Sequence, residues 1–167
     1  LRSALAKIHG TKISGNFHRF VLAADRDSIL EIWPSQLFGW RFNPKGEFGA
    51  LYLSENADTC VKEVNRHVPD VRAFQDRPRI LGTIRVALQK CLALTDPKVL
   101  SALGVTEESI LPDDSPESIQ IAREARLAGF EGILYHSAVD RKCSNLAVFK
   151  DVLMPKSSVA CEQVKLL

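Results

Sequence analysis

Two arginines, one tyrosine and one glutamate carry the groups needed to hold and cleave a dinucleotide: Arg19, Arg41, Tyr52 and Glu63. Two arginines can clamp a pyrophosphate through bidentate, charge-assisted hydrogen bonds. A tyrosine ring offers a stacking surface to a planar heterocycle. A carboxylate can stabilise an oxocarbenium-like transition state and hold a ribose hydroxyl. Together these groups meet the requirements for breaking the nicotinamide–ribose bond of NAD.

Each of these side chains also has an ordinary structural interpretation when it is taken alone. A strand arginine such as Arg19 usually points to solvent or to a carboxylate, and Arg41 could stack on its aromatic neighbours in the sequence. Tyr52 could be a half-buried strand residue with a solvated hydroxyl group, and Glu63 a solvated helix residue. The prediction of chemistry therefore depends on the combination of the four.

The elements that would position these residues can be read from the apolar pattern. Apolar residues at helical spacing predict a helix over about 55–67, which carries Glu63 and which Pro69 would end. Asp-Pro and Ser-Pro starts followed by glycine stops predict two more helices, at 96–104 and 115–129. Strands are expected over 17–22, 50–53, 80–88, 91–94, 132–135, 146–149 and 158–166. Residues 25–48 contain several turn formers and are expected to form a long loop.

The order of these elements predicts an α+β fold with largely antiparallel sheets, because strands and helices mix without regular βαβ alternation. The 167 residues suit one domain over 1–167. The net charge of +2 provides no concentrated basic face, which argues against direct nucleic-acid binding. No apolar run approaches the ~18–20 residues of a membrane span, and residues 1–20 lack the apolar core of a secretory signal. We therefore expect a cytoplasmic domain that does not enter a membrane.

Neither a disulfide nor a metal site is expected. The four cysteines are far apart and form no CxxC pair: Cys60, Cys91, Cys143 and Cys161. We interpret them as reduced, partly buried residues. Glu63 and His67 share a helical face, but a second histidine and a nearby third ligand are missing, so we interpret this pair as ordinary helix surface. Phosphate-loop, dinucleotide-fingerprint, serine-hydrolase and zinc-protease motifs are also absent from the sequence.

Several segments, in order along the chain, resemble the RES domain family, which is named for its Arg, Glu and Ser. GWRFN (39–43) is similar to the family's GGRWN-like loop, ALYLS (50–54) is similar to its short strand, and Glu63 follows at the expected distance on a helix. AGFEGILYHSAV (128–139) and NLAVF (145–149) match the family's later strands.

The resemblance covers about residues 17–151 and implies a fold, a substrate and a partner. The implied fold is like that of the ADP-ribosyltransferases, with two small, mostly antiparallel sheets flanked by helices around an NAD cleft. NAD would be the substrate, and no metal would be used. Family members act as toxins of bacterial toxin–antitoxin pairs and deplete NAD by hydrolysis or phosphorolysis, or transfer ADP-ribose to a protein. The implied partner is an antitoxin with an Xre-like DNA-binding domain, and the resemblance leaves an oligomeric complex open.

The resemblance also implies a role for each matching residue. Arg19 and Arg41 would bind the phosphates and ribose of NAD, and Tyr52 would stack on nicotinamide. Glu63 would stabilise the oxocarbenium ion or activate the acceptor, so that Glu63, Tyr52 and Arg19 are the predicted catalytic residues. Ser137 would hydrogen-bond the ribose beside nicotinamide or hold Glu63.

Asn145 would support this group as a weaker candidate for substrate binding.

Four positions next to the predicted site residues depart from the family pattern: Trp40 replaces a glycine, Phe42 a tryptophan, His18 an aromatic residue, and His136 the proline before the family serine. A bulky side chain at position 40 could narrow the cleft or redirect the loop. None of the four replacements removes a proposed chemical group.

Two alternatives to NAD depletion follow from the same residues. The chain could transfer ADP-ribose to a protein target, which would place label from NAD on protein rather than in a small product. It could also be a catalytically inactive module that binds NAD or a partner, because a fold alone does not establish activity.

Overall fold

Six strands of the computed structural model, which describes residues 1–67 and 76–167, belong to one hydrogen-bonded sheet. Their bounds are β1 (Thr11–Leu22), β2 (Leu51–Ser54), β3 (Arg79–Ala93), β4 (Gly132–His136), β5 (Ser144–Val148) and β6 (Ser158–Leu166). The order is β1-β2-β5-β4-β3-β6, and β1 also pairs with β3, so that the first five strands close into a barrel. The mixed α+β class is confirmed.

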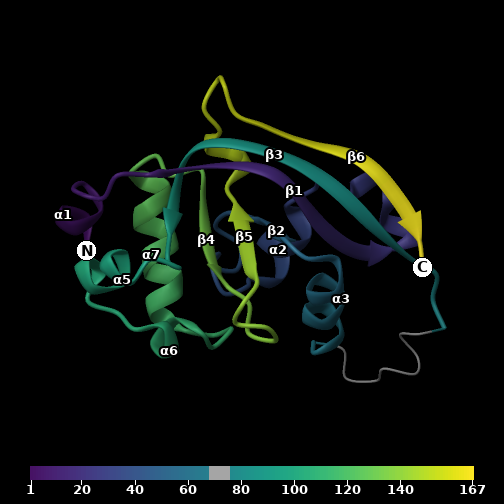
Figure 1. Cartoon of the computed structure of the whole chain (residues 1–167), viewed down its shortest axis with the longest axis horizontal. Helices are drawn as coiled ribbons and strands as arrows, with labels where there is room; N and C mark the ends of the chain where they lie inside the picture. The colour runs from purple at the N-terminus through teal and green to yellow at the C-terminus, as the bar shows by residue number, and fades with distance from the viewer. Residues whose placement is uncertain (68–75) are drawn as a thin grey trace.

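Two antiparallel groups of strands make up this barrel and its extension. β1, β3 and β6 run side by side across the molecule, and β2, β5 and β4 form the second group (Figure 1). The parallel pairing of residues 91–93 with 132–134 joins the groups on one side. On the other side they are joined, within the described residues, by one pair, His18 with Ser54. The two separate sheets expected from the sequence are therefore not confirmed, because pairing on both sides makes them continuous.

Alternate side chains of β2 and β5 pack into two different hydrophobic cores. On β5, Leu146 and Val148 enter a core shared with β1 and β3, whereas Ala147 enters a second core that contains residues of α7. The same period of two places Leu53 of β2 in the first core and Tyr52 against the second. The side chain of Tyr52 therefore leaves the strand on the face opposite to the β1–β3 core.

Short helices surround the barrel, α7 packing along β4 and α3 against β1 and β2 (Figure 1). Their bounds are α1 (Arg2–Leu5), α2 (Trp33–Phe38), α3 (Ala57–Asn65), α5 (Pro97–Leu103), α6 (Glu107–Ile110) and α7 (Pro116–Leu127), with 3₁₀ turns at Ala23–Ser28 and Lys150–Val152. Both proline-initiated helices are confirmed, since Asp96 caps α5 and Ser115 caps α7 through their side chains. The predicted stops Gly104 and Gly129 have φ of 71° and 75°.

Two parts of the chain differ from the expected elements. The two strands predicted over 80–88 and 91–94 form one strand, β3. The strand continues through Gln89 and Lys90 because the backbone amides of these residues donate hydrogen bonds to the buried carboxylate of Glu131. The loop expected over 25–48 contains α2 and a 3₁₀ turn. The helix carrying Glu63 ends at Asn65, and Pro69, its expected stop, lies outside the described residues.

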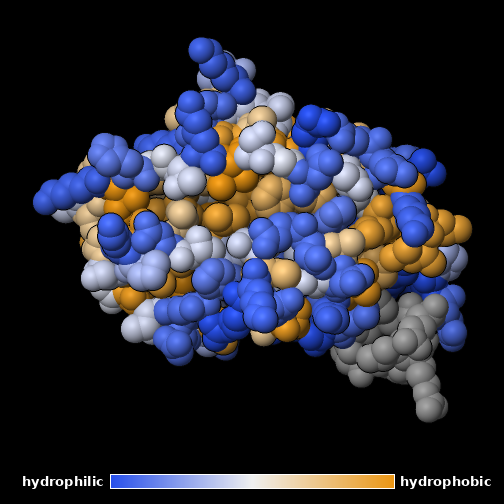
Figure 2. All heavy atoms as spheres, in the orientation of Figure 1, coloured by the Kyte–Doolittle hydropathy of each residue, from blue (hydrophilic) through white to orange (hydrophobic). Residues whose placement is uncertain are grey.

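The viewed surface is mostly hydrophilic, with hydrophobic side chains interspersed (Figure 2). In the described ranges, no helix combines the length and the apolar character required to cross a membrane.

Candidate active site

Glu63 points from α3 towards the ends of β4 and β5. The helix begins where the side chain of Asn56 accepts a hydrogen bond from the amide of Thr59 at 3.0 Å. Cys60 is buried and donates its thiol hydrogen to the carbonyl of His18 on β1 at 3.3 Å, which fixes this face of the helix against the strand. Glu63, one turn further along, is thereby held beside the barrel.

Three donors converge on one oxygen of the Glu63 carboxylate. Its Oε1 accepts hydrogen bonds from the hydroxyl of Ser137 at 2.6 Å, the side-chain amide of Asn145 at 2.8 Å and the backbone amide of Ala138 at 3.1 Å. The other oxygen, Oε2, accepts from Nε of Arg66 at 2.9 Å. These donors come from β5, from the two residues that follow β4 and from the residue that caps the end of α3, so three separate parts of the chain orient the carboxylate.

The environment keeps Glu63 ionised. Burial alone would raise the pKa of Glu63, but the hydrogen bonds from Ser137 and Asn145 and the charge of Arg66 outweigh it, so the pKa is lowered. A fixed, ionised carboxylate of this kind can stabilise positive charge that develops on a substrate.

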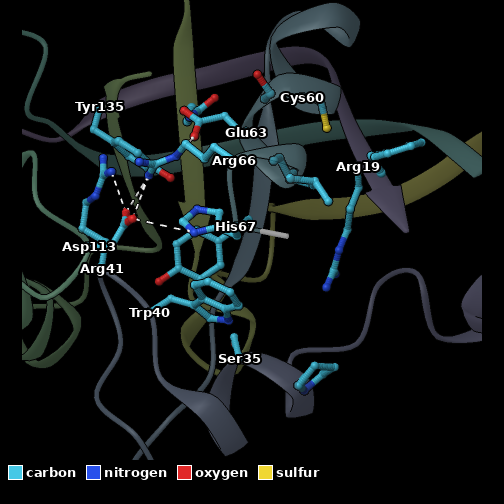
Figure 3. Close-up of a pocket in the computed structure, with 17 residues that line it drawn as sticks. Arg19, Ser35, Trp40, Arg41, Cys60, Glu63, Arg66, His67, Asp113 and Tyr135 are labelled. Atoms are coloured by element: carbon cyan, nitrogen blue, oxygen red, sulfur yellow. Dashed lines mark hydrogen bonds and ion pairs between the residues drawn. The ribbon is translucent and has the colours of Figure 1, made fainter. Parts of the chain in front are cut away.

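A chain of charged groups continues from Glu63 across the site (Figure 3). Nη2 of Arg66 donates to both oxygens of Asp113, at 2.7 and 2.9 Å, and Nη2 of Arg41 donates to Oδ1 of Asp113 at 2.8 Å. Nδ1 of His67 lies 3.8 Å from Oδ2 of Asp113. The pKa of Asp113 is lowered, because the hydrogen bond and charge of Arg41 and the charge of Arg66 outweigh the effect of burial, which is to raise it.

Arg41 is an almost fully buried cation. Its side chain is 6% exposed, its guanidinium carbon lies 5.4 Å from the centre of the Tyr135 ring, and its Nε has no hydrogen-bond partner among the described residues. The turn that places it begins at Gly39, which has φ of 73° and where an added Cβ would lie 2.9 Å from the backbone nitrogen of Lys45. Trp40 and Asn43 close the turn through reciprocal backbone hydrogen bonds of 3.0 and 3.1 Å.

Tyr52 supports this turn through its hydroxyl group. The hydroxyl donates to Oδ1 of Asn43 at 2.8 Å and accepts from the amide of Phe42 at 3.0 Å. The side-chain nitrogen Nδ2 of Asn43 in turn donates to the backbone carbonyls of Ser35 and Phe48. Because the hydroxyl is engaged in this way, the ring of Tyr52 is held in place where it lines the cavity.

Arg19 lies on the other side of the cavity from Arg41 (Figure 3). Its Nη1 donates to the carbonyls of Ile29 and Glu31 at 2.7 and 3.1 Å. Burial lowers the pKa of Arg19 to about 10, so it remains a cation at neutral pH. The two arginines therefore do not form one preassembled clamp in this structure, although both line the same cavity.

The cavity has a volume of about 430 Å³, and its lining includes residues of both β1 and β2, close to the pair His18–Ser54 that joins these strands. Its walls include five of the residues predicted from the sequence to act on or bind substrate: Arg19, Arg41, Tyr52, Glu63 and Asn145. Ser137 is fully buried and contacts the cavity only through Glu63. Of the two positions considered for Ser137, the structure places it against Glu63.

The cavity lining also includes polar residues that sequence reasoning did not assign to the site, among them the arginine, histidine and aspartate side chains of Arg66, His67 and Asp113. Arg66 and His67 follow Glu63 by three and four residues, a spacing that places all three on one helical face and could have identified them. His67 is exposed, and its ring also packs edge to face against that of Trp40, with ring centres 5.3 Å apart, so this surface residue forms part of the cavity wall. Asp113 comes from a distant loop, and no local pattern marks it.

The positions that depart from the family pattern divide between the cavity and the core. Trp40 lines the cavity and is 39% exposed. Phe42 is fully buried, with its ring centre 4.7 Å from that of Tyr135, so this replacement affects packing rather than the cavity wall.

Metal-binding geometry is absent from the described part of the chain, since it contains no group of three or more His, Cys, Asp or Glu side chains that could hold an ion. All four cysteines are free.

Comparison with known proteins identifies the family. A sequence model of the RES domain matches residues 17–163. The chain belongs to the RES domain family. The expected resemblance is therefore confirmed, and the match includes all six of the predicted site residues.

Curated relatives and a solved structure agree with this assignment. The RES domain described here is 38% identical over 115 residues to a protein named probable NAD(+) phosphorylase Rv3189 of Mycobacterium tuberculosis, an alignment covering 68% of this chain and 54% of the relative. It is 30% identical over 105 residues to NAD(+) phosphorylase MbcT of Mycobacterium bovis, covering 60% and 56%. The chain thus spans about half the length of the curated relatives it matches.

The fold of this RES domain is also that of a solved structure. A chain in the crystal structure of the M. tuberculosis MbcT–MbcA toxin–antitoxin complex superposes with a TM-score of 0.85, covering 99% of this chain and 91% of that chain at 24% sequence identity. At this identity, the likeness establishes the fold alone.

Proposed function

We propose that this RES domain cleaves the nicotinamide–ribose bond of NAD and transfers the ADP-ribosyl group to inorganic phosphate. The observation that carries the proposal is the Glu63 carboxylate, which three donors hold on Oε1 and which lines a cavity of about 430 Å³. Cleavage develops positive charge on the ribose ring, and a fixed carboxylate lowers the energy of that charge. The names of the curated relatives, NAD(+) phosphorylases, support phosphate as the acceptor.

The roles proposed for the other residues follow from their positions. Arg19 binds the pyrophosphate of NAD from one side of the cavity, and Arg41 holds anionic oxygens on the other side. The ring of Tyr52 supports the nicotinamide by stacking. Ser137 and Asn145 keep the Glu63 carboxylate in position through their hydrogen bonds to Oε1.

The experiment that tests the function is product analysis after incubation of the native chain with NAD, with and without phosphate. We expect free nicotinamide and ADP-ribose 1″-phosphate, with release that depends on phosphate. Free ADP-ribose at equal rates in both conditions would indicate hydrolysis instead. Label from NAD on protein would indicate ADP-ribosyl transfer, and binding of NAD without release of nicotinamide would indicate an inactive module.

We also propose a biological setting for this activity. NAD depletion in the cytoplasm would make the chain a toxin, to be neutralised by an antitoxin with an Xre-like DNA-binding domain. The fold shared with a chain of a toxin–antitoxin complex supports such a partner. Expression of the chain alone should arrest growth and lower cellular NAD, and the Glu63→Gln variant should do neither.

A further inference from the structure

Three cationic or titratable side chains surround one carboxylate at the wall of the cavity. Asp113 receives hydrogen bonds from the guanidinium groups of Arg41 and Arg66 and lies 3.8 Å from Nδ1 of His67. Arg66 connects this group directly to Glu63, since its Nε donates to Oε2 of Glu63 while its Nη2 donates to Asp113. The guanidinium group of Arg66 would therefore bridge Glu63 and any anion that takes the position of the Asp113 carboxylate.

Arg41 has more hydrogen-bonding capacity than Asp113 uses. Its side chain is 6% exposed, and its Nε–H has no partner among the described residues, although a buried guanidinium donor normally has one. An anion with more oxygen atoms than a carboxylate would offer additional acceptors to Arg41 and Arg66.

Asp113 is positioned so that it could leave without disturbing the elements around it. Its side chain is 39% exposed, and it lies in the segment between α6 and α7. The cap of α7 is provided by Ser115, whose hydroxyl accepts from the amide of Ser118 and donates to the carbonyl of Ser109. The helix is therefore fixed two residues after Asp113 by contacts in which Asp113 takes no part.

We propose that Arg41, Arg66 and His67 form the subsite for inorganic phosphate and that Asp113 is an internal anion which occupies this subsite until phosphate displaces it. The proposal rests on the proposed function, because it makes this phosphate the acceptor in the cleavage of NAD. It adds Arg66 and His67 to the residues that touch substrate, and it makes Asp113 a competitor of the acceptor rather than a binding residue.

The reaction balances with these groups in place. The bond between C1 of the ribose and the pyridinium nitrogen breaks, and its electron pair stays on the nitrogen of neutral nicotinamide. An oxygen of hydrogen phosphate donates an electron pair to C1 and forms the new C–O bond of ADP-ribose 1″-phosphate. A dianion approaching the carboxylate of Glu63 would be repelled, and Arg66, hydrogen-bonded to Glu63 on one side and facing the acceptor on the other, offsets this repulsion.

The opposite role for Asp113 would be structural, namely to hold Arg41 and Arg66 in place. The two roles predict opposite effects when the charge of Asp113 is removed. A competitor that is neutralised leaves phosphate bound more tightly, whereas the loss of a structural partner leaves phosphate bound equally or less tightly.

The experiment is a calorimetric titration of the full chain with inorganic phosphate, without NAD and with ionic strength matched by chloride. The variants are Asp113→Asn and the control Asp114→Asn, which changes the net charge equally at an exposed residue outside the cavity lining. We expect the Kd for phosphate of Asp113→Asn to fall on the order of tenfold below that of the native chain and of Asp114→Asn. Equal or weaker binding by Asp113→Asn would overturn the proposal.

A second variant keeps the test decisive if Asp113→Asn does not fold. Arg66→Gln in the otherwise native chain should lose measurable phosphate binding, and retention of the native Kd would refute the subsite. The titration also separates this proposal from the proposed function, because it contains no NAD. Tight phosphate binding by Asp113→Asn together with no release of nicotinamide from NAD would refute the function and support the subsite.

Discussion

Replacement of Glu63 by glutamine tests the central electrostatic role of the site while preserving its shape. The glutamine oxygen can still accept the three hydrogen bonds that Oε1 receives from Ser137, Asn145 and the amide of Ala138. The new amide group, however, would face Nε–H of Arg66, so that two donors meet where an ion pair was. The main change is the loss of one negative charge beside the ribose.

The structure sets the expected size of the effect. Removal of one preorganised group that stabilises transition-state charge typically lowers kcat by about 10²–10³-fold, or about 3–4 kcal/mol in barrier. The free energy of unfolding should fall by much less, at most about 1 kcal/mol. Arg66 loses its ion pair with Glu63 but keeps its hydrogen bonds to Asp113. KM for NAD should change little if Glu63 acts mainly in the transition state.

The assay is the initial rate of nicotinamide release at saturating NAD and phosphate, with thermal unfolding measured in parallel. Asp58→Asn is the matched control, because Asp58 is an exposed acid on the same helix and lies outside the cavity lining. It should keep kcat within about twofold, as surface substitutions usually perturb little. A loss of less than tenfold in folded Glu63→Gln would refute the electrostatic role assigned to this carboxylate.

Other predictions concern the residues around the carboxylate and the thiols. Ser137→Ala removes a donor to Glu63 and should raise the pKa of that carboxyl, so activity on the acid side should disappear at a higher pH than in the native chain; an unchanged acid limb would contradict this. Tyr52→Phe should lower the free energy of unfolding by about 1–2 kcal/mol in denaturant titrations while keeping KM for NAD, whereas Tyr52→Ala should raise KM. The rate of nicotinamide release at a fixed pH should fall with added salt if arginines bind the phosphates, and a flat salt profile would count against that. In labelling with a thiol reagent, Cys143 should react before Cys60, because burial raises the pKa of the Cys60 thiol to about 12.

The elements that could be predicted from the sequence are those with strong local signals. The Ser-Pro start at Ser115 and the glycine at 129 marked α7 because both features fix backbone conformation within a few residues. The continuity of β3 could not be predicted, since the polar pair Gln89-Lys90 resembles a strand end. The amides of this pair are satisfied by Glu131, about forty residues away, which no local pattern reveals.

The same distinction applies to the site. The residues Arg19, Arg41, Tyr52 and Glu63 could be named because a motif carries them, and all four line the cavity. Their connections could not be predicted, because they depend on tertiary contacts. Asp113 lies 72 residues from Arg41 along the chain, so its pairing with Arg41 follows only from the folded barrel.

Within the part of the chain that the structure describes, β1 and β2 are joined by one residue pair, His18 with Ser54, which makes this the weakest junction between neighbouring strands of the barrel. On its other edge β1 is paired with β3 over a much longer stretch, from Leu22 with Arg79 to Thr11 with Cys91, which makes that junction stiff. Local opening should therefore concentrate at the junction of β1 and β2, where we expect amide hydrogens to exchange with solvent most readily. A dinucleotide that contacts Arg19 on β1 and Tyr52 on β2 would bridge the two strands at this point. Bound substrate would then stabilise the closed barrel as well as react within it.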